Sequence, residues 1–141
     1  MWTVKRVELI ADAVEVFISK DCAFCALIDP VLRYAVQLGY IGLVRRIEFQ
    51  DKQRYLRTIE EIAKKYQQKR TYPILLVFHE GKEVMVPAHV IDEIIDIMTS
   101  LDDQTVLRII VGELTWESLG DTLVQPTSKL ILGISDALKN P

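Results

Sequence analysis

A chain of 141 residues is the length of one domain, with room for a short extension. Half of the residues are apolar and about a quarter are charged, which excludes an intrinsically disordered chain. The net charge of −3 argues against a broad basic surface for nucleic acid. No apolar run approaches the roughly 18 residues of a membrane span. Charged residues within the first eight positions argue against a signal peptide, so we expect a cytoplasmic protein with neither nucleic acid nor a membrane as its partner.

The first half of the chain alternates strand and helix patterns. Residues 14–18 form a β-branched run that ends at a polar cluster, which predicts a strand. Apolar residues at helical spacing predict a helix from Cys22 to Gly39 that is kinked, but not ended, by Pro30. A second strand is predicted over 43–49, followed by a long helix with Asp51 as its N-cap. The apolar face of that helix holds Tyr55, Leu56, Ile59, Ile62, Ala63 and Tyr66.

A hairpin and a third helix are predicted next. Residues 74–78 and 83–86 read as antiparallel strands joined by a turn at 80–82, and a helix follows Pro87 and ends near Leu101. The predicted order is therefore strand, helix, strand, helix, hairpin, helix. The first two strands should be parallel, because a helical crossover joins them. These patterns predict an α/β fold around a mixed four-stranded sheet.

Residues 102–141 are predicted to form a mainly helical C-terminal extension to a domain of residues 1–101. Asp102 could cap a helix that carries Val106, Leu107, Ile110 and Leu114, although 106–111 also fits a strand. Residues 127–138 read as a helix with Pro126 just before it and with Leu130, Ile131, Ile134 and Leu138 on one stripe. Because this segment is too apolar for a free linker, we expect it to pack on the domain or to form a homodimer contact.

Both cysteines lie in one tetrapeptide, Cys22-Ala23-Phe24-Cys25, between a predicted strand and a predicted helix. Unpaired backbone N–H groups and the helix dipole stabilise a thiolate at a helix N-terminus, which lowers the pKa of the first cysteine. Cys25 follows one turn along the same helix, close enough to form a disulfide. Cys22 is therefore the candidate nucleophile towards a substrate disulfide, and Cys25 is the candidate thiol that resolves the mixed disulfide.

The cysteine pair has two other interpretations. The two side chains could simply pack at the start of a helix, or they could supply two of the four ligands of a structural zinc site. His79 and His89 are isolated in the sequence, so such a metal would have to bridge two chains. The position of the pair at a strand-to-helix junction favours redox chemistry. We expect no metal and no other cofactor.

Four features, in this order, resemble the thioredoxin and glutaredoxin superfamily over about residues 14–101. Residues 14–25 look like its strand and active-site turn, and Pro30 sits where thioredoxins have a helix-kinking proline. Tyr72-Pro73 resembles the family's cis-proline site, and 79–84 resembles its hairpin turn. The resemblance implies a thioredoxin-like fold, β-α-β-α-β-β-α, with a cis bond before Pro73. It also implies a substrate groove formed by Ala23, Phe24, Tyr72 and Pro73.

The chain departs from the family pattern at several positions. The dipeptide between the cysteines is Ala-Phe, and its aromatic residue is closer to the glutaredoxin pattern than to the thioredoxin pattern. Val16 stands where thioredoxins bury an aspartate, and Tyr72 stands where the family usually has Thr or Val. The chain before residue 14 is too short for an additional βα unit. The resemblance therefore implies the trimmed, glutaredoxin-like form of the fold.

Together, the pattern and the resemblance predict a thiol–disulfide oxidoreductase that works by dithiol–disulfide exchange through Cys22 and Cys25. Its expected partners are protein or glutathione-type disulfides and an upstream reductase or small thiol. The rival hypothesis is a thioredoxin-fold interaction module whose cysteines are regulatory or vestigial. In that case the extension would dock a partner or a second copy, with Trp116, Leu119, Leu123 and Val124 as the candidate contacts.

Overall fold

A mixed four-stranded sheet forms the centre of the computed structural model, which describes residues 8–140. The strands follow the order β2-β1-β3-β4, with β1 and β2 parallel and the other neighbours antiparallel. They are β1 (Ala11–Ser19), β2 (Ile41–Phe49), β3 (Ile74–His79) and β4 (Lys82–Met85). Helices α1 (Ala23–Gln37), α2 (Lys52–Lys65) and α3 (Ala88–Thr99) complete the predicted order. The α/β class and the mixed sheet are thus confirmed.

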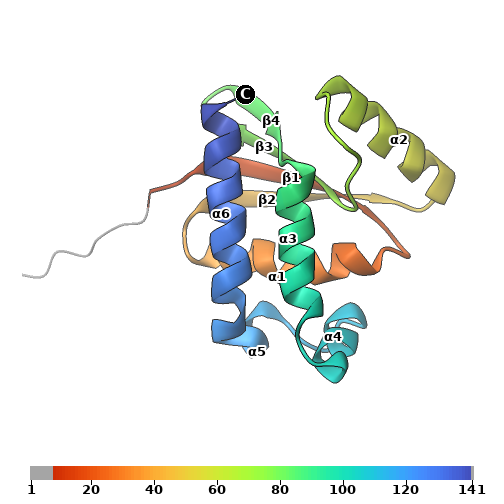
Figure 1. Cartoon of the computed structure of the whole chain (residues 1–141), viewed down its shortest axis with the longest axis vertical. Coiled ribbons are helices and arrows are strands. Elements are labelled where there is room, and N and C mark those ends of the chain that lie inside the picture. The colour runs from red at the N-terminus through yellow and green to blue at the C-terminus, as the bar shows by residue number, and fades with distance from the viewer. Residues whose placement is uncertain (1–7, 141) are drawn as a thin grey trace, which may run out of the picture.

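Helices cover both faces of the sheet (Figure 1). On one face, α1, α3 and α6 (Val124–Lys139) pack against the strand residues Val14, Val16, Leu75 and Val77. On the other face, α2 packs against Phe17, Ile74, Leu76 and Met85. Because β3 is covered on both sides, its first five residues, 74–78, are all apolar and show no alternation.

Local interactions set the start of α2 and the turn of the hairpin. The Asp51 carboxylate accepts a hydrogen bond from the backbone N–H of Gln53 at 3.0 Å, so this residue caps α2 as predicted. The β3–β4 turn places Glu80 and Gly81 in the left-handed backbone region, with φ of 49° and 81°. Two such residues in succession match the twist of the flanking strands.

The structure decides between the alternatives for residues 102–141 in favour of helices. Asp102 caps α4 (Asp103–Ile110), so the strand predicted as an alternative over 106–111 is wrong. The expected stripe of α4 is also partly wrong, because Leu107 is 59% exposed while Ile109 is buried. α5 (Trp116–Leu119) and a 3₁₀ turn over 120–123 lead into α6. Here Pro126 lies within the first turn rather than before the helix, where its missing N–H would have had no partner.

The chain after Leu101 contributes directly to the core on the α1 face. Leu119, Leu123, Leu130 and Ile134 are buried together with residues of β1, α1 and α3. The Trp116 ring lies against Tyr34 of α1, with 6.3 Å between the ring centroids. Of the four side chains considered as docking contacts, Leu119 and Leu123 are buried, Trp116 is partly buried and Val124 is half exposed. Whether this region also joins two copies of the chain stays a prediction.

Helices α3 and α6 lie side by side, and one glycine sets their separation (Figure 1). A Cβ atom at Gly133 of α6 would lie 2.5 Å from the Cγ1 atom and 2.8 Å from the Cγ2 atom of Val90 in α3. Val90 is buried and its β-branched side chain has restricted rotamers, so it has little freedom to move aside. Glycine is therefore required here for close approach of the two helices.

We expect Gly133→Ala to destabilise the protein by about 1–3 kcal/mol through overpacking, despite the higher helix propensity of alanine. Urea unfolding measures the change in the free energy of unfolding. The matched test adds Val90→Ala, because removing the two methyl groups should make the cost of Gly133→Ala much smaller. An equal cost of Gly133→Ala in both backgrounds would contradict the proposed contact.

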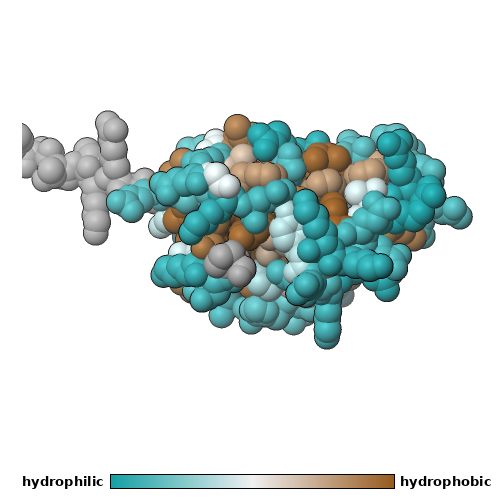
Figure 2. All heavy atoms as spheres, turned by 90° about the horizontal axis from the view of Figure 1, so that it is seen from above, coloured by the Kyte–Doolittle hydropathy of each residue, from teal (hydrophilic) through white to brown (hydrophobic). Residues whose placement is uncertain are grey.

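One face of the surface carries apolar side chains in several separate patches. Seen from the end of the molecule where α6 ends, hydrophilic side chains separate the apolar patches (Figure 2). No helix within residues 8–140 is both long enough and apolar enough to cross a membrane.

Candidate active site

Cys22 and Cys25 form a disulfide where β1 leads into α1. Their Cα atoms are 5.3 Å apart, one helical turn along the chain. Cys22 is the N-cap residue of α1, and its Sγ atom accepts a hydrogen bond from the backbone N–H of Cys25 at 3.2 Å. The predicted junction of strand, turn and helix therefore places the first sulfur at the positive end of the helix dipole. A thiolate at Cys22 would accept the same hydrogen bond once the disulfide is reduced.

The two cysteines differ in their access to solvent. Cys22 is partly exposed, whereas Cys25 is 6% exposed and belongs to the core cluster on the α1 face. Lys20 and Asp21 flank the turn with opposite charges, so their effects on the charge of Cys22 oppose each other. Solvent access and the helix N-terminus both favour Cys22 as the thiol that meets a substrate.

We therefore expect alkylation of the reduced protein at mildly acidic pH to label Cys22 well before Cys25. The helix N-terminus favours the thiolate of Cys22, and the thiolate is the species that attacks iodoacetamide. Peptide mapping by mass spectrometry measures the labelling rate of each cysteine. Faster labelling of Cys25 would reverse the roles assigned to the two thiols.

A groove of about 300 Å³ opens beside Cys22. Three of the predicted substrate-binding residues line it: Ala23, Phe24 and Tyr72. Ala23 and Phe24 are exposed, so both present their side chains to an incoming substrate. Pro73 is buried and does not line the groove, but the Tyr72–Pro73 bond is cis, as the resemblance implied. The hydroxyl of Thr71 donates to the carbonyl of Pro73 at 2.8 Å, which holds this loop in place.

Tyr55 is the main site residue that the sequence did not reveal. It comes from α2 on the opposite face of the sheet, and it is 2% exposed. Its hydroxyl oxygen lies 3.7 Å from the Sγ atom of Cys25 and donates a hydrogen bond to the backbone carbonyl of Phe17 at 2.9 Å. Burial, and to a smaller extent the neighbouring Tyr72, raise the pKa of Tyr55, so the phenol stays protonated at neutral pH.

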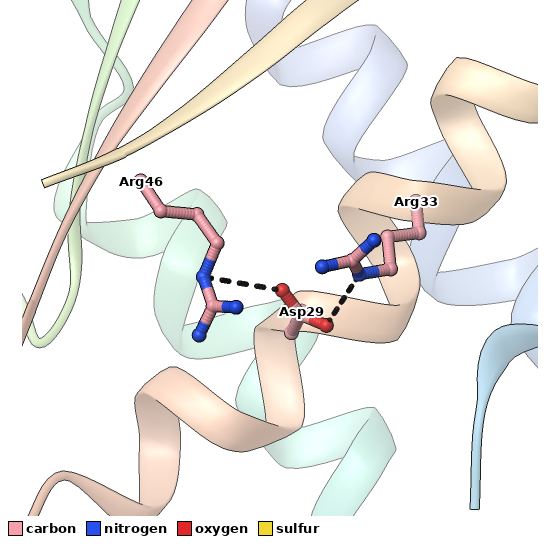
Figure 3. Close-up of polar contacts among 3 residues, drawn as sticks. All are labelled: Asp29, Arg33 and Arg46. Atoms are coloured by element: carbon pink, nitrogen blue, oxygen red, sulfur yellow. Dashed lines mark hydrogen bonds and ion pairs between the residues drawn. The ribbon is translucent and has the colours of Figure 1, made fainter. Parts of the chain in front are cut away.

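A second hollow, of about 150 Å³, contacts both cysteines and is lined by several charged side chains, among them Lys20, Asp29, Arg46 and Glu48. Val16 of β1 also lines it. Asp29 of α1 lies between two arginines (Figure 3). Its carboxylate contacts the Nε atom of Arg33 at 2.8 Å and that of Arg46 on β2 at 3.9 Å. The wall of this hollow therefore combines cationic and anionic groups within reach of the sulfurs.

The residues around the disulfide offer no metal site. Within residues 8–140, no three side chains of His, Cys, Asp or Glu are grouped so that they could hold a metal ion. His79 is placed beside Asp12 at the β3–β4 end of the sheet, with 3.4 Å between its Nδ1 atom and a carboxylate oxygen.

Comparison with known proteins adds no relative. No protein-family model matches the chain, and no curated protein or solved structure matches it either. The interpretation of the site therefore depends on its own residues and geometry.

Proposed function

We propose that this chain is a thiol–disulfide oxidoreductase with a thioredoxin-like fold, acting through Cys22 and Cys25. One observation carries the proposal: a Cys-x-x-Cys disulfide whose first sulfur is partly exposed at a helix N-terminus and whose second sulfur is buried one turn further on. A solvent-accessible thiol stabilised as a thiolate is suited to capture a substrate, and a shielded neighbour is suited to resolve it.

The proposed exchange has two steps. The Cys22 thiolate attacks one sulfur of a substrate disulfide, which forms a mixed disulfide and releases the other sulfur as a thiolate that takes up a proton. Cys25 then loses its proton and attacks the Cys22 sulfur, which restores the Cys22–Cys25 disulfide and releases the reduced substrate. Phe24 and the backbone of Tyr72, beside the groove, would hold an extended substrate segment by strand-like pairing.

The proposed partners follow from this chemistry. An upstream reductase or a small thiol must return the Cys22–Cys25 disulfide to the dithiol after each cycle, because each turnover consumes two electrons. We place this cycle in the cytoplasm, with protein or glutathione-type disulfides as substrates.

An insulin disulfide-reduction assay tests the proposal. With dithiothreitol as the electron source, the wild-type chain is expected to accelerate insulin reduction, and Cys22→Ser is expected to lower the rate to that of dithiothreitol alone. A folded wild-type chain that accelerates nothing, with either dithiothreitol or glutathione, would contradict the enzyme and favour the rival interaction module. Circular dichroism of both proteins provides the control for folding.

A further inference from the structure

In the oxidised protein, the contact between Tyr55 and Cys25 has no hydrogen atom that could form a hydrogen bond between them. A phenol has one hydrogen to donate, and here the backbone carbonyl of Phe17 accepts it at 2.9 Å. The Cys25 sulfur, 3.7 Å from the same oxygen, carries no hydrogen while it is part of the disulfide. In the oxidised protein the oxygen and the sulfur therefore meet as two acceptors, and neither satisfies the other.

Reduction of the disulfide supplies the missing hydrogen atom. The free Cys25 thiol acquires one S–H hydrogen, and the phenol oxygen of Tyr55 has lone pairs directed away from its own donated hydrogen. Cys25 is 6% exposed and Tyr55 is 2% exposed, so water competes poorly for either group. A buried polar atom that gains a partner is stabilised relative to one that has none. The contact is thus satisfied in the dithiol and unsatisfied in the disulfide.

We propose that Tyr55 is a positioning residue that stabilises the reduced form by accepting a hydrogen bond from the Cys25 thiol. This inference rests on the proposed function, since it assigns a role in the redox equilibrium of the same cysteine pair. The proposed hydrogen bond forms in the resting dithiol and is given up in the second step of the exchange, when Cys25 loses its proton and attacks the Cys22 sulfur.

The equilibrium concerned is the exchange of the protein disulfide with glutathione. Two glutathione thiols are oxidised to one glutathione disulfide, and their two electrons and two protons reduce the Cys22–Cys25 bond to two thiols. The proton that arrives on the Cys25 sulfur stays there, and the resulting S–H group donates a hydrogen bond to the Tyr55 oxygen. Removal of this acceptor should therefore shift the equilibrium towards the protein disulfide and make the reduction potential more negative.

The test is the glutathione redox equilibrium of Tyr55→Phe, which keeps the ring and removes only the hydroxyl. A neutral hydrogen bond contributes about 1 kcal/mol, so we expect the equilibrium constant to shift about threefold to tenfold towards the disulfide. For a two-electron couple this shift is about 14 to 30 mV. Tyr66→Phe, at the C-cap of the same helix and outside the contacts of the cysteines, is the matched control and should leave the equilibrium unchanged.

A spectroscopic measurement tests the hydrogen bond directly. In a Cys22→Ala chain, Cys25 is the single thiol, and its S–H stretching frequency falls when it donates a hydrogen bond. We expect a lower frequency in the folded chain than for a thiol in an apolar solvent, and a return towards that value when Tyr55→Phe is added, because the buried thiol then loses this acceptor. If Tyr55→Phe does not fold, the frequency of folded Cys22→Ala against that of the thiol in apolar solvent still tests the contact.

An unchanged potential in a folded Tyr55→Phe protein, or a shift towards the dithiol, would overturn the role of Tyr55. A frequency in folded Cys22→Ala equal to that of a thiol in apolar solvent would overturn it as well. Insulin turnover is a separate measurement: a wild-type chain with no turnover contradicts the proposed function, whereas the equilibrium with glutathione can be measured without any turnover.

Discussion

Cys25→Ser is expected to accumulate mixed disulfides with protein substrates, and Cys22→Ser is expected to form none. Capture requires the partly exposed thiol of Cys22 at the N-cap of α1. Release requires the buried sulfur of Cys25, whose Cα atom lies 5.3 Å from that of Cys22. In the absence of Cys25 the mixed disulfide has no internal thiol to attack it, because a serine hydroxyl does not attack disulfides. Substitution of Cys22 is therefore expected to abolish trapping completely.

Non-reducing electrophoresis of each variant with a disulfide-containing substrate measures the trapped complex, and a reducing lane confirms that a disulfide holds it. The double variant, Cys22→Ser with Cys25→Ser, is the matched control for non-covalent association. Equal trapping by the two single variants would show that the thiols do not act as an ordered pair. Trapping by Cys22→Ser alone would reverse their roles.

Truncation after Leu101 is expected to lower the stability or the solubility of the chain severely. It removes five large side chains that are buried in the core on the α1 face: Ile109, Leu119, Leu123, Leu130 and Ile134. Burial of one such side chain stabilises a protein by about 1.5–3 kcal/mol, and a whole domain is stable by only about 5–15 kcal/mol. The truncation would also expose the apolar surfaces of α1 and α3 on which these side chains lie. Any product that stays soluble should keep its dithiol activity, since both cysteines precede the cut.

Two point substitutions in α6 test the packing of this helix without shortening the chain. Ile134→Ala should lower the free energy of unfolding by about 2–5 kcal/mol, because the isoleucine is fully buried. Leu132→Ala, two residues away and 62% exposed, should change it by less than about 0.5 kcal/mol. Urea unfolding of the full-length variants measures both changes. A truncated chain as stable as the full chain, or equal effects of the two substitutions, would contradict this assignment of the core.

Local patterns in the sequence predicted the sheet and the helices that position the cysteines. Apolar residues at helical or continuous spacing depend only on near neighbours, so the order from β1 to α3 could be derived before any long-range contact was known. The alternative left open over 106–111 shows the limit of this reasoning. A short apolar run fits a helix or a strand equally well, and the Asp102 cap together with burial of Ile109 against the core favours the helix.

Tyr55 shows why part of the site could not be predicted. In the sequence it occupies an apolar stripe with Ile59 and Ala63, a pattern that indicates packing and no chemistry. Its contact with Cys25 spans 30 residues, and its hydrogen bond to Phe17 spans 38. Both depend on how α2 crosses β1, which no local pattern encodes. The ion pair between Asp29 and Arg46 depends in the same way on how α1 packs beside β2.

The place of β2 at one edge of the sheet has a consequence for self-association. An edge strand carries unpaired backbone groups and invites the same strand of another molecule to add to the sheet. In an antiparallel pair of β2 strands centred on Arg45 and Arg46, arginines of one molecule would face arginines of the other. Like charges directly opposite destabilise such a pair. In this register Arg46, whose ion pair with Asp29 lies at the hollow that contacts the cysteines, would therefore disfavour the pairing of two molecules edge to edge.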